Sequence, residues 1–230
     1  DLALVGFDNG LDVTVTAPDN SSEADVFVFG GTYGAISVGV TGNTDADAAV
    51  VIEASNTDAE VGLGDYTTTI SSVTVSSQST DSTQAEGAAI LHLDGHSVSD
   101  GIMGVGTVSI DDVSLTGNFN TQLHVDDFSD GSTVTLGDID LNINVSDEWD
   151  NEGGITLAGN AGAAITLGNI SVDVSAINDV GNDSLNWTSA LWITDDEGST
   201  ITAGNIDVTW SNQSDAYADS NVDNEIWVGA

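Results

Sequence analysis

Apolar and polar residues alternate strictly over many short stretches of the chain, which predicts β-strands. The clearest stretches are three copies of one phrase, TLGDIDLNI, TLGNISVDV and TAGNIDVTW, which begin at Thr135, Thr166 and Thr202. Their starts are 31 and 36 residues apart. Each copy has a threonine, then a glycine followed by Asn or Asp, then an alternating run that begins with isoleucine. A phrase that returns at this spacing is typical of a repeat architecture.

The glycine-containing pair in each copy coincides with a change in the phase of the alternation. Leu136 and Ile139 are three residues apart, whereas side chains on one face of a flat strand are separated by even numbers. A corner between them would let both runs point their apolar side chains inward. Glycine accepts unusual backbone angles, and Asn or Asp tolerates the left-handed region, so these residue types suit a corner. The predicted corners are Gly137–Asp138, Gly168–Asn169 and Gly204–Asn205.

Each repeat is expected to contain a short apolar strand, a polar turn, a second strand and, after the corner, a third strand. One such unit could not bury its own apolar face, but stacked units share a continuous core. We therefore predict an all-β fold, a parallel β-helix or β-solenoid of about seven irregular three-strand rungs. A β-sandwich is the alternative, because regularly spaced short strands are also typical of that fold. We expect a single domain over residues 1–230, with repeats at 25–49, 50–88, 89–121, 122–153, 154–189 and 190–224 and a partial copy at 225–230.

The charge of the chain is extreme. Its 230 residues include 38 Asp and Glu and no Lys or Arg, so the formal net charge is −38. Without basic side chains, the protein cannot neutralise nucleic-acid phosphates, and anionic membrane surfaces repel it. We expect neither partner. High charge can indicate disorder, but a hydrophobic content of 40% that is rich in β-branched residues favours a packed β-fold.

The G-[ND]-I corners, together with the absence of Cys, Lys and Arg, resemble the acidic β-solenoid regions of bacterial surface-layer proteins and secreted adhesins. The resemblance covers most of the chain. It implies an exported protein that binds calcium and assembles at the bacterial cell surface. The calcium-binding nonapeptide G-G-x-G-x-D-x-U-x of secreted toxins is absent, so no calcium ligand can be transferred from that repeat.

Acidic side chains gather at the turn that follows the first strand of several repeats. Calcium takes six to eight oxygen ligands, and stacked rungs would bring equivalent turns about 4.8 Å apart. We therefore predict calcium at these turns, with a merely solvated acidic surface as the alternative. The stretch DDFSDG resembles the start of an EF-hand loop, but Phe128 stands at a ligand position. The candidate ligands are Asp94, Asp126, Asp127, Asp130, Asp195, Asp196 and Glu197.

Histidine could offer a second kind of metal site. His92 and His124 each lie between two apolar residues, so both should point outward from equivalent strands of neighbouring rungs. A zinc site would need a third or fourth ligand, which His96 or Asp94 could supply. We favour a pair of stacked surface imidazoles.

Two further outward features are expected. Trp192 and Trp227 should occupy, in later repeats, the outward position of the histidines, where exposed aromatic residues would mark a contact surface unless loops cover them.

A column of Thr135, Thr166 and Thr202 should be continued by two residues, Ser109 and Thr69. Flat threonine arrays occur in some ice-binding solenoids, but one column is thinner than such an array, and threonine is a common outward strand residue.

Catalysis is not expected. Parts of the chain resemble the N-T-D, D-D and G-H-G signatures of polygalacturonases, which are β-helix enzymes. The order of these parts differs, the second glycine of G-H-G is missing, and the basic R-I-K signature cannot exist here. Paired carboxylates can hydrolyse glycosides, but pairs are unavoidable among 38 acids. The matching stretches are Asn43–Asp45, Asp126–Asp127 and Gly95–His96.

The two ends of a solenoid leave backbone groups unpaired, and natural proteins usually protect such edges with Lys, Pro or a cap. Here Lys is absent and Pro18 is the only proline. The chain opens with the strand-like DLALVGF and closes on EIWVGA, which reads as the first strand of another rung. We predict that these ends pair head to tail between copies, a contact that builds filaments. The predicted interface residues are Leu2, Leu4, Ile226, Trp227 and Val228.

The predicted function is that of a secreted structural subunit, without enzymatic activity, that assembles with itself into an extracellular filament, surface layer or matrix. Divalent cations would offset its charge. The alternative is an adhesive or ligand-binding segment of a larger cell-surface protein, with cell-surface glycans as partners. A polysaccharide-active β-helix enzyme ranks behind both.

Overall fold

The computed structural model describes residues 1–17, 23–42, 46–56, 64–79, 87–95, 105–117, 121–145, 153–176, 191–194, 198–212 and 226–229. All regular secondary structure in these segments is β-strand. Fifteen strands form one sheet in which every pairing is parallel. The described part of the chain contains no helix that is long and apolar enough to cross a membrane.

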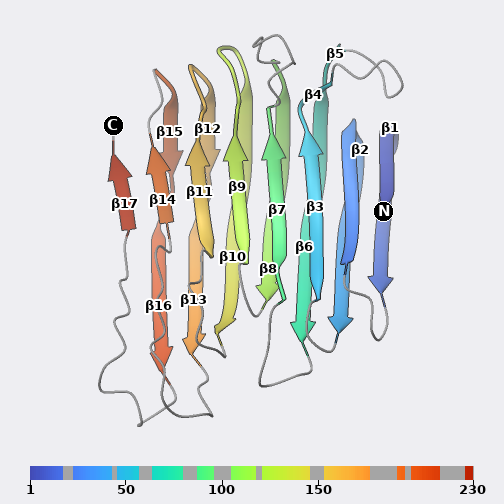
Figure 1. Cartoon of the computed structure of the whole chain (residues 1–230). Helices are drawn as coiled ribbons and strands as arrows, with labels where there is room; N and C mark the ends of the chain where they lie inside the picture. The colour runs from blue at the N-terminus through green and yellow to red at the C-terminus, as the bar shows by residue number, and fades with distance from the viewer. Residues whose placement is uncertain are drawn as a thin grey trace.

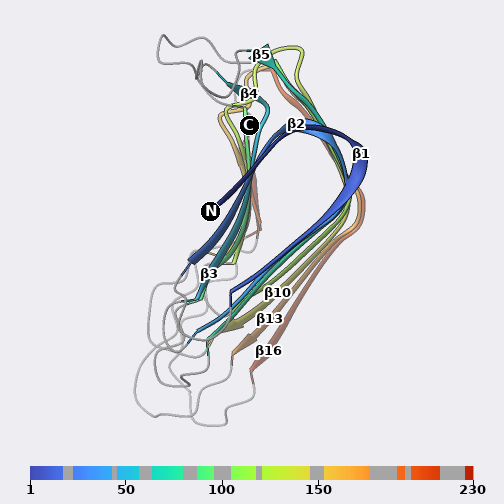
Figure 2. The same cartoon turned by 90° about the vertical axis from the view of Figure 1, so that its right-hand side faces the viewer.

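The sheet coils into two faces that enclose the core (Figure 1 and Figure 2). Two long strands, β1 (Leu2–Ala17) and β2 (Glu23–Gly42), run over both faces. After them, each rung, or turn of the coil, has a short strand on the first face, and the rungs from β3 to β14 continue on the second face as one long strand or as two shorter ones. The first-face strands are β3 (Asp47–Glu53), β7 (Ala89–Asp94), β9 (Gln122–Asp126), β11 (Gly154–Ala158), β14 (Leu191–Thr194) and β17 (Ile226–Gly229).

The strands of the second face are paired in the same rung order. They are β6 (Thr67–Ser79), β8 (Thr107–Gly117), β10 (Thr133–Val145), β12 (Ala164–Leu167) with β13 (Ile170–Ala176), and β15 (Thr200–Ala203) with β16 (Ile206–Asn212). A separate antiparallel pair, β4 (Ser55–Asn56) and β5 (Gly64–Asp65), lies between β3 and β6 in the chain.

The predicted parallel β-solenoid is confirmed. Thr135 pairs with Thr166, which pairs with Thr202, so the phrase in the sequence returns at the same place in successive rungs. Parallel pairing between rungs also distinguishes this fold from an antiparallel β-sandwich. Three separate strands occur in the rungs of β11–β13 and β14–β16. In the rungs of β8 and β10, the second and third strands are one continuous strand, and β1 forms a further rung ahead of residue 25.

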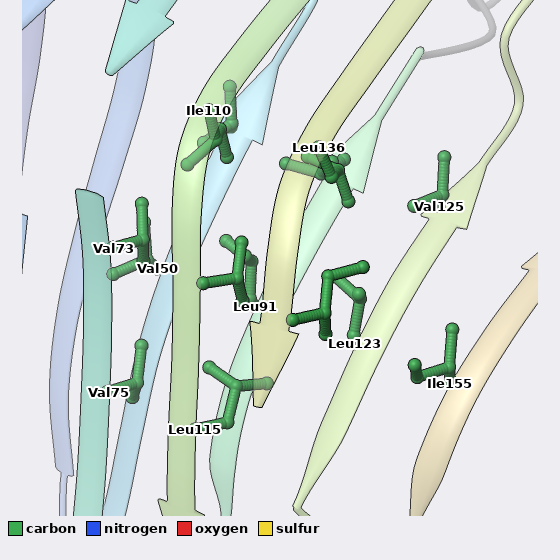
Figure 3. Packing of buried hydrophobic residues seen from close by; sticks show 14 of the residues in the cluster. Val50, Val73, Val75, Leu91, Ile110, Leu115, Leu123, Val125, Leu136 and Ile155 are labelled. Carbon is green, nitrogen blue, oxygen red and sulfur yellow. The ribbon is translucent and has the colours of Figure 1, made fainter. Parts of the chain in front are cut away.

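The core consists of columns in which each rung contributes one inward side chain (Figure 3). On the first face, one column contains six residues that are at most 1% exposed. Burying a large aliphatic side chain contributes roughly 1.5–3 kcal/mol, and no rung could bury its own side chains without a neighbour on each side. The members of this column are Val26, Val50, Leu91, Leu123, Ile155 and Leu191.

One core position does not match its column. Thr68 is fully buried, and its hydroxyl has no hydrogen-bond partner among the described residues. In the register of the second face, the same position is Val108 in the next rung and Val134 in the one after. Valine has nearly the shape of threonine without the polar group, so the column itself shows which residue the site prefers.

We predict that Thr68→Val raises the free energy of unfolding by about 1–3 kcal/mol, because a buried hydroxyl without a partner is removed. Chemical denaturation of the two proteins measures the difference. Thr74→Val, at an exposed position of the same strand, is the matched control and should change stability by less than about 0.5 kcal/mol. If Thr68→Val and Thr74→Val change the free energy of unfolding equally, the unpaired buried hydroxyl of Thr68 is not the cause of the change.

Candidate functional site

The three predicted corners stack on one another and form a side-chain ladder. The Oδ1 atom of Asp138 accepts hydrogen bonds from the backbone N–H of Asn169 at 3.2 Å and from its side-chain amide at 2.9 Å. The Oδ1 atom of Asn169 accepts the same two bonds from Asn205, at 3.3 and 3.2 Å. Asn can both donate and accept, whereas ionised Asp only accepts. An acid therefore fits the first step of this ladder, and amides fit the later steps.

The corner glycines are needed for a reason other than the predicted one. Neither they nor Asp138, Asn169 and Asn205 have a positive φ, so the expectation of unusual or left-handed backbone angles was wrong. The cause is close contact between rungs. A Cβ atom on Gly168 would lie 2.5 Å from the carbonyl oxygen of Gly137, and a Cβ atom on Gly204 would lie 2.8 Å from that of Gly168.

The acidic residues of the first face are brought together in part. Asp94 and Asp126 are register partners on adjacent rungs, and Glu53 precedes them in the same outward column. The prediction missed Glu53, although the sequence could have shown it. The three equivalent first-face strands contain VIE, LHLD and LHVD, and each stretch ends on an acid two residues after an outward position. Like charges directly opposite one another are unfavourable, so this column concentrates negative charge.

The other candidate metal ligands do not join this column. Asp127 is the residue after Asp126 and has a left-handed backbone conformation, with a φ of 58°. Asp130 lies in the turn that follows, beside Gly162. Phe128 between them is fully buried in the core, which explains why the EF-hand match fails. Within the described segments, no three His, Asp or Glu side chains lie close enough together to hold a metal ion. Asp195, Asp196, Glu197, His96 and Asn43–Asp45 lie outside these segments.

The two histidines lie side by side on adjacent rungs, as predicted, but their rings meet edge to face and do not stack. His92 and His124 are register partners, with ring centroids 5.9 Å apart and ring planes at 67°. The Nε2 atom of His92 lies 2.7 Å from Oδ1 of Asp126, and His124 contacts the neutral side chain of Gln122. The hydrogen bond to Asp126 raises the pKa of His92; burial opposes this shift, and the charges of Asp126, Asp94 and Asp127 add to it.

The outward column that holds the histidines continues through Thr156 to Trp192 and Trp227. The predicted equivalence of these positions is therefore confirmed. Trp192 is 37% exposed. Trp149 and Trp187 lie outside the described residues, and only the backbone is described at Trp210 and Trp227.

A shallow hollow of about 470 Å³ lies on the second face, where β1, β2, β6, β8 and β10 run side by side. It is lined by hydroxyl and amide side chains, with Gly39 and Val40, and no charged or aromatic side chain contributes to it. Such a lining offers neutral hydrogen bonds alone. The polar residues are Thr16, Ser37, Thr41, Ser76, Ser77, Gln78, Thr116 and Asn144.

The predicted end residues lie at the two ends of shared core columns. The column through Val26 and Leu191 begins at Leu2 and ends at Ile226, and the adjacent column begins at Leu4 and ends at Val228. Leu2 is 38% exposed and Leu4 is 5% exposed. The backbone of β17 is described, but its side chains are not.

Comparison with known proteins adds no relative: no family model, no curated protein and no solved structure matches the chain.

We predict a graded loss of stability when the corner glycines are changed to alanine. Gly137→Ala should destabilise most, because its Cβ would overlap the carbonyl oxygen of Asp111. Gly168→Ala should follow, and Gly204→Ala should have the smallest effect. Overpacking of this kind typically costs about 1–3 kcal/mol. Denaturation midpoints of the three variants measure the order of their stabilities. Equal losses of stability, or the reverse order, would show that close contact between rungs is not the reason for the glycines.

A pH dependence follows from the His92–Asp126 pair. Because the folded pKa of His92 lies above 6.5, the stability from the pair is fully present below the unfolded pKa. It is lost as the pH rises through the folded pKa. We predict that His92→Gln lowers the free energy of unfolding more at about pH 5.5 than at about pH 8.

His124→Gln, which removes the neighbouring imidazole, is the control and should show a smaller dependence. Comparison of variants is needed because other groups titrate in the same range. Burial and a hydrogen bond to Glu23 raise the pKa of Asp25 to about 6. If His92→Gln costs the same at both pH values, the pair does not stabilise the fold.

Proposed function

We propose that this protein is a secreted structural subunit that joins head to tail with copies of itself in a filament, surface layer or matrix at the bacterial cell surface. The observation that supports this proposal is that apolar side chains are exposed on the outermost described strands, β1 and β16. The proposed join continues the parallel pairing of the rungs from one copy to the next.

The first open edge is β1, which pairs on one side with β2 and has no described strand on the other. Four large apolar side chains of β1 are 38–46% exposed. Exposed apolar side chains on an unpaired strand are a template for another strand. They belong to Leu2, Val5, Phe7 and Leu11.

The second open edge consists of β17 on the first face and of β15 and β16 on the second. Ile206 in β16 is 41% exposed, whereas Ile170 and Ile139, which precede it in the same column, are 2% and 0% exposed. The same residue type is thus buried inside the stack and uncovered at its end. This edge of the second face therefore leaves apolar surface exposed to water.

The two edges differ in shape, and the difference favours a contact on the first face. In the described residues, β17 extends the first face by one strand beyond β15 and β16, whereas β1 covers both faces. A copy that docks its β1 on β17 would therefore leave one strand position unfilled on the second face. For this reason we propose a contact on the first face, where Ile226 of one copy would lie beside Leu2 of the next.

Charge opposes this assembly, because each copy has a formal charge of −38. The Debye length is about 8 Å at physiological ionic strength, so nearby copies still repel one another. We propose that divalent cations, calcium first, screen this repulsion by accumulating around the acidic surface, including the column of Glu53, Asp94 and Asp126. This role needs no preformed cage of ligands.

Two single-edge variants test the head-to-tail contact. Leu2→Asp should block the first edge and Ile226→Asp the second, because each places an unpaired carboxylate in an apolar contact. Each variant alone should remain monomeric in calcium. An equimolar mixture should form dimers, since each variant retains the edge that its partner needs. Light scattering and electron microscopy, with calcium and then with chelator, measure the outcome.

Val105→Asp is the matched control, because Val105 is 40% exposed outside the edge strands and the charge change is the same. This variant should polymerise like the unmodified chain. Monomers of the unmodified chain in both conditions would overturn the proposal and favour the adhesive alternative, to be tested with glycans. Polymers that persist in chelator would retain the structural role and remove that of calcium.

A further inference from the structure

Two neighbouring columns of outward side chains cover the part of the second face that precedes the corner. The predicted column of Thr135, Thr166 and Thr202 is confirmed, and Ser109 and Thr69 continue it to Thr32. A second column lies two residues earlier on the same strands, and the prediction missed it. We call the two columns together the threonine array. The second column consists of Thr67, Thr107, Thr133, Ala164 and Thr200.

The composition of the array contrasts with the rest of the surface. Every position except Ala164 carries a hydroxyl group, and none carries a charge. Across the corner in the same rungs, the outward positions include Asp140, Asp173 and Asp207 on β10, β13 and β16. On the first face they include the acidic column described above. In a chain with 38 acids, an outward area of this extent without one acid differs from its surroundings.

The hydroxyl groups of the array are available to solvent. Each of its side chains is exposed except Ser109, which is half-buried. Within the described segments, none of these hydroxyls forms a side-chain hydrogen bond to another residue. Their hydrogen-bonding capacity, one donor and two acceptor lone pairs each, is therefore directed at water.

The array is also rigid and regular. On β10 and β12, the inward side chains between and behind its columns are at most 2% exposed; they are Val134, Leu136, Ile165 and Leu167. On the last strand, β15, the inward Ile201 and Ala203 are half-buried. The register over β8, β10, β12 and β15 has no bulge in this region. Side chains therefore repeat about 4.8 Å apart across the strands and about 6.7 Å apart along them. Threonine adds stiffness of its own, because its branched Cβ restricts χ1.

We propose that the threonine array binds ice. The oxygen lattice on the faces of hexagonal ice repeats in two directions on lengths of about this size, so water held by successive hydroxyls can be continuous with the crystal. Many weak contacts add up when little conformational freedom is lost, and the packed strands have already fixed these side chains. The threonine methyl groups fill the spaces between the bound waters. Charged groups, which hold ions and differently oriented water, are absent from the array.

This inference does not depend on the proposed assembly. The array lies on the side of the solenoid, whereas the proposed contacts lie at its ends. It extends over five strand spacings, about 24 Å, within one copy. The test can therefore use chelator and dilute protein, in which single copies are present.

Thr135→Tyr and Thr166→Tyr, in the middle of the array, test the proposal. Thermal hysteresis and the fraction of protein incorporated into a growing ice crystal are measured for each. A bulky ring would hold the crystal away from the neighbouring hydroxyls, so we expect both quantities to fall at least about tenfold. Thr74→Tyr is the matched control, because Thr74 is an exposed threonine on β6 beyond the corner. It should behave like the unmodified chain.

Circular dichroism and melting temperature check that the variants are folded. If a tyrosine variant unfolds, Thr166→Ala, which removes one hydroxyl without added bulk, replaces it and should lower both quantities. Exclusion of the unmodified chain from ice, without hysteresis, would overturn the proposal. An equal loss in Thr74→Tyr would do the same, because ice would then contact another surface.

Discussion

Parallel hydrogen bonding between successive rungs is the constraint on which the rest of this structure depends. It holds equivalent residues of different repeats in line, so that each choice of side chain is repeated along an axis. Aliphatic residues in line form the core, as from Val26 to Leu191. Asn and Asp in line form the corner ladder, acids in line form the column of Glu53, Asp94 and Asp126, and hydroxyls in line form the threonine array. Each of these features therefore requires the neighbouring rungs.

This constraint explains what the sequence could predict and what it could not. The odd step between Leu136 and Ile139 located the corner, and the repeated phrase fixed the pairing of Thr135 with Thr166. These signals lie within one repeat or in the comparison of two. The role of Gly168 could not be found in that way, because the contact that excludes a side chain comes from the carbonyl of Gly137 in another rung. The sequence analysis missed the rung formed by β1 because β1 does not contain the repeated phrase. It missed the second threonine column because the residues of that column lie two positions before the phrase begins.

The acidic side chains of the described strands occupy outward positions of the rungs. Acids lie at outward positions while the core columns are almost entirely apolar, and one acid, Asp126, lies 2.7 Å from His92. Repulsion among the remaining carboxylates is balanced by the stacked core and by whatever cations the solvent supplies. Two kinds of surface differ from this acidic pattern. Apolar side chains are exposed on the outermost strands β1 and β16, and the threonine array carries no acid. Contact at the array removes no hydration from ionised groups of the array itself, and the two proposals rest on these two surfaces.

The central claim, that the rung register can continue from one copy to the next, has a direct test because the chain contains no cysteine. A chain with both Leu2→Cys and Ile226→Cys would place the two thiols on adjacent strands of neighbouring copies. At that separation a disulfide can form with little movement of the backbone. Mild oxidation in calcium, followed by denaturing electrophoresis without reductant, should give a ladder of covalent multimers, whereas either single-cysteine chain should remain monomeric. Monomers from the double variant, or dimers from a single variant in equal yield, would contradict the account.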